Sequence, residues 1–291
     1  MARLISSSVS DSSITASIGY NDQTYTFGWK DVATFQKYFS IQNAQLVQRD
    51  FTPGLDKCTE SVVINPDKWI TKLPDIGFES VLLNKWYDIS TIIDLPANAK
   101  VINIGCGCSV SNLFLAQHNP TAMFWLYDKE GWYYNPDVLY MENSPYHHHA
   151  WSVVEDGIKN SGGGLDRSRF TLCSPTDPFP SDVDLIYSIG ALGFHHGIHV
   201  NDYLNRITNS LKVGGVLLLD IILTHDFNIE DAIAEAMNSE KLWDRPLMRA
   251  EDDNGVTHTN VTHTPGTSRS SGLPGYSSHQ QVGYRAKWIK K

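Results

Sequence analysis

The chain has 291 residues, which is enough for one large hydrophobic core or for one core and a small accessory domain. Its formal net charge of -9 argues against a protein that binds nucleic acid through a basic face. No apolar run approaches the roughly 20 residues of a membrane span, and the first ten residues lack the apolar segment of a signal peptide. We therefore expect a cytoplasmic protein with no nucleic-acid or membrane partner.

The first part of the chain predicts a β-hairpin. Residues 1–12 are rich in serine, and we expect them to be frayed. Residues 14–20 (ITASIGY) and 23–29 (QTYTFGW) alternate and carry β-branched or aromatic side chains, as strands do. Asn21 and Asp22 lie between them and favour a tight turn.

The next stretch predicts a short helix and then an irregular cap. Apolar side chains recur at helical spacing in residues 31–39, whereas prolines and glycines interrupt residues 41–74. Helical spacing returns at residues 78–93, directly before the first strand of the core. We therefore divide the chain into an N-terminal hairpin and accessory cap at residues 1–77 and a main domain at residues 78–291.

A glycine-rich turn joins a buried strand to a helix at the start of the main domain. Residues 101–104 form a short, mostly β-branched run, and residues 112–118 have the pattern of a helix. Gly105 and Gly107 allow a close backbone approach, and the N–H groups at the helix start can face polar groups of a ligand. A dinucleotide fingerprint would need glycine where Val110 stands. The turn is therefore a candidate site for another ligand, or a structural turn in some other α/β protein.

The same turn resembles a motif of class I S-adenosylmethionine (SAM) methyltransferases, in which an acidic residue and any residue precede G-x-G-x-G. Asn103 stands in the acidic position, and Ser109 stands in the position of the third glycine. These are two departures from the family pattern. The resemblance implies that Asn103, Gly105, Cys106 and Gly107 contact SAM.

The cysteines do not predict a disulfide or a zinc site. Cys106 and Cys108 are too close in sequence for an ordinary disulfide, and Cys58 and Cys173 have no paired spacing such as C-x-x-C. We expect reduced thiols.

An acidic residue ends the next predicted strand. The run AMFWLYD, residues 122–128, ends at Asp128, which lies 23 residues beyond Gly105. An acid at this position can accept hydrogen bonds from both ribose hydroxyls of a bound nucleoside. The alternative is a surface aspartate in a turn. We take Asp128 and its neighbour Lys129 as candidate cofactor-binding residues.

The histidines do not predict a metal centre. His147, His148 and His149 are consecutive, and on a helix they would point about 100° apart, so they cannot converge on one ion. We expect them to face a substrate or the surface. His258 and His263 alternate on a predicted strand, and we assign them to its surface face.

Two more strands of the core follow. A helix at residues 152–159 leads to a strand at residues 169–173, and a nearly continuous apolar run predicts a further strand at residues 183–189. The candidate cofactor-binding residues at the carboxyl ends of these two strands are Ser174, Pro175, Thr176, Ser188 and Ile189.

A second, longer stretch carries the same resemblance. The string DLIYSIGALGFHHGIHVNDYLNRITNSLKVGGVLLLDI resembles the fourth strand, helix and fifth strand of class I SAM methyltransferases, including the LKVGG turn before the fifth strand. Its GFH ending and its YL-R-I-SLK-GG spacing are similar to bacterial sugar O-methyltransferases. The resemblance covers about residues 78–225. After a helix at residues 229–237, VTHTNVTHT (256–264) and VGYRAKWIKK (282–291) are expected to be the sixth and seventh strands.

The resemblance implies an α/β, Rossmann-like, doubly wound fold. Its seven-stranded, mostly parallel sheet would have the order 3-2-1-4-5-7-6 with the last strand antiparallel, in addition to the N-terminal hairpin and cap. Ligands of such sheets bind at the carboxyl ends of the strands, near the switch point between the first and fourth strands. The residues at such ends in the sequence are Gly105, Gly107, Asp128, Ser174 to Thr176 and Ser188 to His196, and we predict that they converge.

The implied reaction is methyl transfer from SAM to a small-molecule hydroxyl, with a sugar or nucleotide sugar as the expected acceptor. A sugar hydroxyl is a poor nucleophile and gains from a base that removes its proton. Histidine suits that role at neutral pH. His195 matches the histidine of the GFH ending, and His196 is the alternative.

Two other classes of function stay open. One is a SAM-fold enzyme that acts on a protein, a lipid or an amine. The other is a degenerate SAM-fold binding module without catalysis, favoured by Asn103 and Ser109. The D/N/S-P-P-F/Y/W motif of enzymes that methylate exocyclic nitrogens is absent, since the fourth strand ends in SIGAL. The sequence does not predict an oligomeric state.

Overall fold

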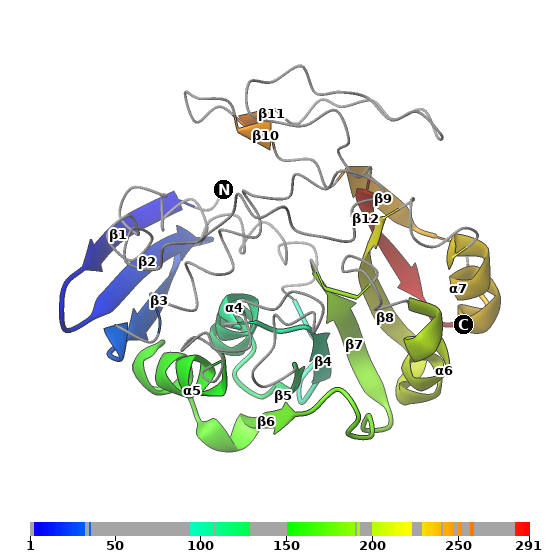
Figure 1. The fold of residues 1–291 in the computed structure, drawn as a ribbon, viewed down its shortest axis with the longest axis horizontal. Helices are drawn as coiled ribbons and strands as arrows, with labels where there is room; N and C mark the ends of the chain where they lie inside the picture. The colour runs from blue at the N-terminus through cyan, green and yellow to red at the C-terminus, as the bar shows by residue number, and fades with distance from the viewer. Residues whose placement is uncertain are drawn as a thin grey trace, which may run out of the picture. The chain divides into compact units, whose positions relative to one another are not determined.

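A computed structural model describes about half of the chain (Figure 1). The described residues are 3–32, 35, 94–107, 109–128, 150–189, 191–192, 200–222, 229–239, 241–246, 250–251, 257–258 and 283–291. They fall into two compact units. The first includes described residues up to Ala99 and from Cys106 to Thr176, and the second includes Lys100–Gly105 and Asp177–Lys291.

The first unit begins with an antiparallel sheet of three strands in the order β1-β2-β3. The strands are β1 (Arg3–Val9), β2 (Ile14–Tyr20) and β3 (Gln23–Trp29). Asn21 and Asp22 join β2 to β3 with φ angles of 46° and 61°. Positive φ at both central residues is what a tight two-residue hairpin turn requires. The hairpin prediction is therefore confirmed.

The expectation of a frayed start is wrong for Arg3–Val9. This segment pairs with β2 along its length, so that Ser6 lies opposite Ser17 and Ser8 opposite Thr15. Serine has no strong strand preference, and the pairing with β2 supplies the order that the local sequence does not signal. An irregularity between Leu4 and Ser6 interrupts the register.

One face of this sheet belongs to the core. The side chains of Ile14, Ala16 and Ile18 on β2 are buried, as are those of Tyr25, Phe27 and Trp29 on β3. Alternation of buried and exposed positions is the expected pattern for an antiparallel sheet that is covered on one side.

Helices and two parallel strands complete the first unit. These elements are α4 (Val110–His118), β5 (Met123–Tyr127), α5 (Ala150–Asn160), the short 3-10 helix η1 (Arg167–Arg169) and β6 (Phe170–Cys173). They match the predicted helices at residues 112–118 and 152–159 and the predicted strands at residues 122–128 and 169–173. Strands β5 and β6 pair in parallel from Phe124 with Phe170 to Tyr127 with Cys173.

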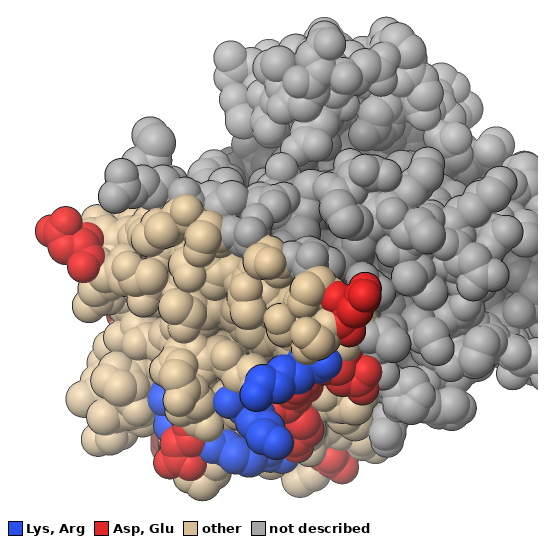
Figure 2. Space-filling view, turned by 90° about the vertical axis from the view of Figure 1, so that its left-hand side faces the viewer, with Lys and Arg blue, Asp and Glu red and all other residues tan. Residues whose placement is uncertain are grey.

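Figure 2 shows one face of the molecule with its charged side chains. On this face the Lys and Arg side chains lie together in the lower part among several Asp and Glu side chains, and a further acidic group lies apart at the upper left. One ion pair of this unit joins Arg167 Nε to Glu155 Oε2 at 2.7 Å.

The second unit holds the other parallel strands and the C-terminal part of the chain. Its elements are β4 (Lys100–Ile104), β7 (Val183–Ser188), α6 (Val200–Ser210), β8 (Leu211–Ile222), α7 (Ile229–Met237), β9 (Trp243–Pro246), β10 (Ala250–Glu251), β11 (Thr257–His258) and β12 (Gly283–Ile289). The order of its main strands is β4-β7-β8-β12-β9. The pairs β4–β7 and β7–β8 are parallel, whereas β12 is antiparallel to both β8 and β9.

A mixed α/β fold with a mostly parallel sheet is therefore confirmed, and so are the predicted helix at residues 229–237 and the C-terminal antiparallel strand. The order of all seven strands as one sheet stays a prediction. The domain boundary between residues 77 and 78 also stays a prediction. It lies outside the described residues, and so do the cap and most of the helix predicted at residues 31–39. No helix in the described part of the chain is long and apolar enough to cross a membrane.

One prediction for the second unit is wrong. Thr257 and His258, the described residues of the strand predicted at 256–264, do not lie beside β12. Thr257–His258 instead pairs with Ala250–Glu251, and β9 lies beside β12. The sequence of β9, Trp-Asp-Arg-Pro, lacks alternation, and its proline is tolerated because β9 is at the edge of the strand order.

The LKVGG segment lies inside β8 (Leu211–Ile222), but the pairing of β8 with β7 passes from Leu211 directly to Val216, and Gly214 has a φ of +81°. The chain therefore leaves the regular ladder where the sequence predicted a turn. The glycines of this segment pair with the C-terminus of the chain. Gly214 N donates to Lys290 O at 2.8 Å, and Lys290 N donates to Gly215 O at 2.9 Å. These hydrogen bonds hold the irregular segment against the last residues of the chain.

Candidate functional site

The glycine turn begins in the second unit with a residue that must be glycine. Gly105 follows β4 with a φ of +73°, a conformation that L side chains rarely adopt. A Cβ atom at Gly105 would lie 2.1 Å from the Cβ of Ala191. The need for glycine thus arises from Ala191 and the backbone, whereas the sequence had attributed it to the approach of a ligand.

Ser188 joins the end of β4 to the segment after β7. Its hydroxyl donates to Ile104 O at 2.8 Å and accepts from Leu192 N at 2.8 Å. The side chain is fully buried. Its hydroxyl therefore holds two segments together, and its neighbour Ile189 is partly exposed at the same strand end.

Asn103, in the position of the family's acidic residue, lies within β4. It is buried and stands opposite Tyr187 of β7 in the parallel register. The strand ends that carry Gly105 and Ser188 are therefore adjacent, because β4 and β7 are neighbours in the order of strands.

The turn continues in the first unit, where it meets the end of β5. Cys106 N donates to Tyr127 O at 3.2 Å, and Gly107 N donates to Asp128 Oδ2 at 2.7 Å. Gly107 has a φ of +54°. Asp128 is partly exposed. The predicted meeting of the glycine turn with the acid that ends the second strand is present in the structure.

Ser109 is the last residue of the turn and the N-cap of α4. Its φ is 57°, and its side chain makes no capping hydrogen bond to the helix. Its hydroxyl is buried and has no hydrogen-bond partner among the described residues. A buried hydroxyl that lacks a partner is costly. A polar group of a ligand or a water molecule at the start of α4 would remove that cost. The sequence had identified Ser109 only as a departure from the family pattern.

The segment after β6 lies at the same edge as Asp128. Asp128 N donates to Cys173 O at 3.2 Å, and Ser174 follows Cys173 directly. The hydroxyls of Ser174 and Thr176 are 3.0 Å apart and both residues are exposed. Pro175 between them is partly exposed. The structure thus brings Ser174 close to Asp128, as predicted.

Cys106 and Cys173 are buried, and their thiols donate to Gly107 O and to Thr171 O, each at 3.7 Å. The described residues contain no group of three His, Cys, Asp or Glu side chains that could hold a metal ion. Lys129, His195 and His196, the histidines 147–149 and Cys108 lie outside the described residues.

Comparison with known proteins gives distant structural likeness only. No protein-family model matches the chain, and a search of curated proteins finds no match. A precorrin-6y C5,15-methyltransferase from Geobacter metallireducens is 13% identical, with a TM-score of 0.37 over 72% of this chain and 87% of that one. A TehB-like SAM-dependent methyltransferase from Corynebacterium glutamicum is 15% identical, with a TM-score of 0.39 over 72% and 88%. A putative RNA methyltransferase from Pyrococcus horikoshii is 12% identical, with a TM-score of 0.40 over 72% and 83%. Likeness at this level does not bear on activity, which has to be argued from the residues of this chain.

Proposed function

We propose that the protein is a SAM-dependent methyltransferase. The observation that carries this proposal is the hydrogen bond from Gly107 N to Asp128 Oδ2, which joins a glycine turn at the start of a helix to an acid at the end of the next strand. A glycine turn at a helix start and an acid beside it can together bind a ligand in which a nucleoside carries a charged amino-acid group, as in SAM.

Asp128 would bind the ribose of SAM. A carboxylate offers about four acceptor sites, so the hydrogen bond from Gly107 is compatible with further donors such as the two ribose hydroxyls. Hydrogen bonds to a charged acceptor contribute about 1.5 to 3 kcal/mol.

The glycine turn would bind the amino-acid end of SAM. The start of α4 carries a partial positive charge, which favours the carboxylate of that end. The buried hydroxyl of Ser109 stands at the same helix start and would gain a partner there. Ser188 would act indirectly, because its hydrogen bonds hold the strand end that leads into Gly105.

SAM supplies an activated methyl group, and the protein would align the acceptor with it, since alignment accounts for much of the rate of such a transfer. We infer that the acceptor is a small-molecule hydroxyl, with a sugar or nucleotide sugar as the first class to test. His195, with His196 as its alternative, would remove the hydroxyl proton. The sequence similarity of the GFH ending supports this part of the proposal.

Calorimetry with SAM followed by a transfer screen tests the proposal. The screen would use labelled SAM with nucleotide sugars, free glycans, proteins, lipids, amines and nucleic acids. Binding of SAM with label incorporated into sugars is the expected result. Incorporation of label only into protein, lipid or amine would support a methyltransferase but refute a sugar as its acceptor.

A second candidate is a binding module that keeps the fold without the reaction. Asn103 and Ser109 favour it, because both differ from the methyltransferase motif. SAM binding without transfer to any acceptor would support this candidate. No heat of binding at millimolar SAM would refute the SAM site itself.

A further inference from the structure

Helix α4 is buried on all of its sides. Seven consecutive residues, Val110 to Ala116, are buried. A helix at the surface of a protein buries one stripe and exposes the other. Other parts of the chain must therefore cover the side of α4 that would otherwise face solvent.

Strand β3 supplies part of this cover. The rings of Phe27 and Phe114 have centroids 4.3 Å apart, and those of Tyr25 and Phe114 are 6.1 Å apart. Trp29 packs against α5 at Gly157, where an added Cβ would lie 2.7 Å from Trp29 Nε1. The N-terminal sheet is thus packed on α4 and α5.

Gln117, in the last turn of α4, binds the edge of β3 as a neighbouring strand would. Its Oε1 accepts from Thr26 N at 2.9 Å, and its Nε2 donates to Thr26 O at 3.0 Å. One side chain therefore satisfies both backbone groups of Thr26. Gly162 N, just beyond α5, also donates to Thr26 O at 3.0 Å.

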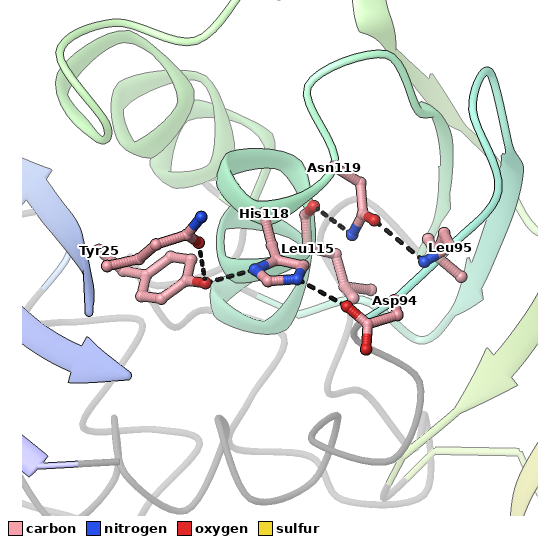
Figure 3. A network of polar contacts seen from close by, with 7 residues as sticks. Tyr25, Asp94, Leu95, Leu115, His118 and Asn119 are labelled. Carbon is pink, nitrogen blue, oxygen red and sulfur yellow. Dashed lines mark hydrogen bonds and ion pairs between the residues drawn. The ribbon is translucent and has the colours of Figure 1, made fainter. Parts of the chain in front are cut away.

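His118 forms a second anchor in the same turn (Figure 3). Its Nδ1 is hydrogen bonded to the hydroxyl of Tyr25, and its Nε2 lies 2.9 Å from Asp94 Oδ1. The Tyr25 hydroxyl also donates to Gln23 Oε1 at 2.8 Å. Tyr25 is buried, and burial, with Tyr20 and Asp94 nearby, raises its pKa to about 12. The chain Tyr25–His118–Asp94 therefore links β3 to the last turn of α4 and to Asp94.

The two ends of α4 thus have different partners. The last turn is fixed to β3, while the first residue follows Ser109 and the glycine turn. A helix of nine residues is about 13 Å long and moves as a rigid element. A shift of its last turn would change the position of Ser109 and Gly107 relative to Asp128.

We propose that the N-terminal sheet is a fixed brace for the glycine turn, and that Gln117, His118 and Tyr25 are positioning residues of the cofactor site. The part of this proposal that concerns SAM depends on the proposed function. The mechanical part does not, since it concerns only the hydrogen bonds and packing between β3 and α4.

Hydrogen exchange separates these two parts. The parent protein would be compared with Gln117→Ala, with Tyr25→Phe, which keeps the ring that packs on Phe114, and with the double variant. Arg167→Ala is the control, because it removes side-chain hydrogen bonds to Glu155 elsewhere in the same unit. Backbone amides of residues 105–113 would be followed in the absence of SAM. We expect about tenfold faster exchange there in the double variant and no change in the control.

Calorimetry on the same proteins adds the second measurement. The double variant should bind SAM several-fold more weakly than the parent, and Tyr25→Phe should lie between them. If exchange accelerates only in residues 23–30 and 117–118, the brace proposal is refuted, and the sheet is merely a cover. If the parent fails to bind SAM, the proposed function is refuted while the exchange result still decides on the brace. If the double variant does not fold, Gln117→Ala and Tyr25→Phe are each compared with the parent in the same two measurements.

Discussion

At the scale of single residues, Asp128 joins the glycine turn to the end of β5 and carries the clearest prediction. Asp128→Ala should weaken SAM binding by about tenfold or more, because the ribose hydroxyls lose a charged acceptor. Calorimetry measures this change, and Asp128→Asn, which keeps the shape, should fall between the two. Circular dichroism would confirm that each variant is folded. If a folded Asp128→Ala protein binds SAM as tightly as the parent, Asp128 does not take part in SAM binding.

Gly105 and Gly214 form a matched pair for a test of stability. Both have positive φ, but an added Cβ at Gly214 meets no atom of the described residues within 4 Å, whereas at Gly105 it meets Ala191 at 2.1 Å. Gly214→Ala should lower the free energy of unfolding by about 1 to 2 kcal/mol from backbone conformation alone. Gly105→Ala should cost about 1 to 3 kcal/mol more, because the segment around Ala191 must shift. Denaturant unfolding measures both changes, and equal losses would contradict the contact with Ala191.

Ser109 predicts opposite effects on stability and on binding. Ser109→Ala removes a buried hydroxyl that lacks a partner among the described residues, so the protein without ligand should be as stable as the parent or more stable. If that hydroxyl contacts SAM, the loss of one hydrogen bond worth about 0.5 to 1.5 kcal/mol should weaken binding about 2- to 12-fold. Thermal unfolding and calorimetry on one preparation test the two effects together. A less stable variant with unchanged affinity would assign the hydroxyl to the fold alone.

At the scale of secondary-structure elements, the sequence predicts those whose cause is local. The hairpin depends on Asn21 and Asp22, which adopt the positive φ angles that the turn needs. Helix α4 and strand β5 follow from apolar runs next to the glycine turn. The position of the glycine turn and its contact with Asp128 follow from the spacing of Gly105, Gly107 and Asp128 in the sequence. This part of the candidate site was therefore predictable.

The elements and contacts that the sequence did not predict have distant causes. Strand β1 forms because β2 is available, although its serines give no strand signal. Strand β9 forms because β12, about 40 residues later, offers an edge. The contact of Gly105 with Ala191 and the binding of Gln117 to Thr26, which are 91 residues apart, cannot be found from local spacing. That the hydroxyl of Ser109 lacks a partner among the described residues was likewise visible only once its burial was known.

The anchor between β3 and α4 predicts a dependence of stability on alkaline pH. Because the pKa of Tyr25 is raised from 10.0 to about 12 in the folded protein, the unfolded chain loses this proton first. The contribution of Tyr25 to stability is complete below pH 10 and is lost as the pH rises from 10 to 12. In Tyr25→Phe this part of the decline should be absent. Urea unfolding at several pH values in that range measures it, and parallel curves for the two proteins would show that Tyr25 titrates normally.

At the scale of the whole molecule, the prediction concerns the reaction. If His195 is the base, His195→Ala should lower the rate of methyl transfer by about 10² to 10⁴ while SAM affinity stays near the parental value. The rate in the parent should rise with pH as the histidine loses its proton, and the variant should lack this rise. Turnover at saturating acceptor and calorimetry with SAM provide the two measurements. Near-parental turnover would direct the search to His196 and then to the histidines 147–149.

The covered edge of β3 also affects how the protein behaves toward other copies of itself. A sheet with an open edge can add a strand from another molecule, which is a common route to aggregation. Here the amide of Gln117 and the backbone of Gly162 occupy the hydrogen-bonding groups of Thr26, and Ser161 Oγ accepts from Gly28 N at 3.2 Å. The opposite edge, β1, is interrupted between Leu4 and Ser6. The hydrogen bonds that fix β3 to its helices therefore also occupy this edge of the sheet, where a strand from another molecule would otherwise pair.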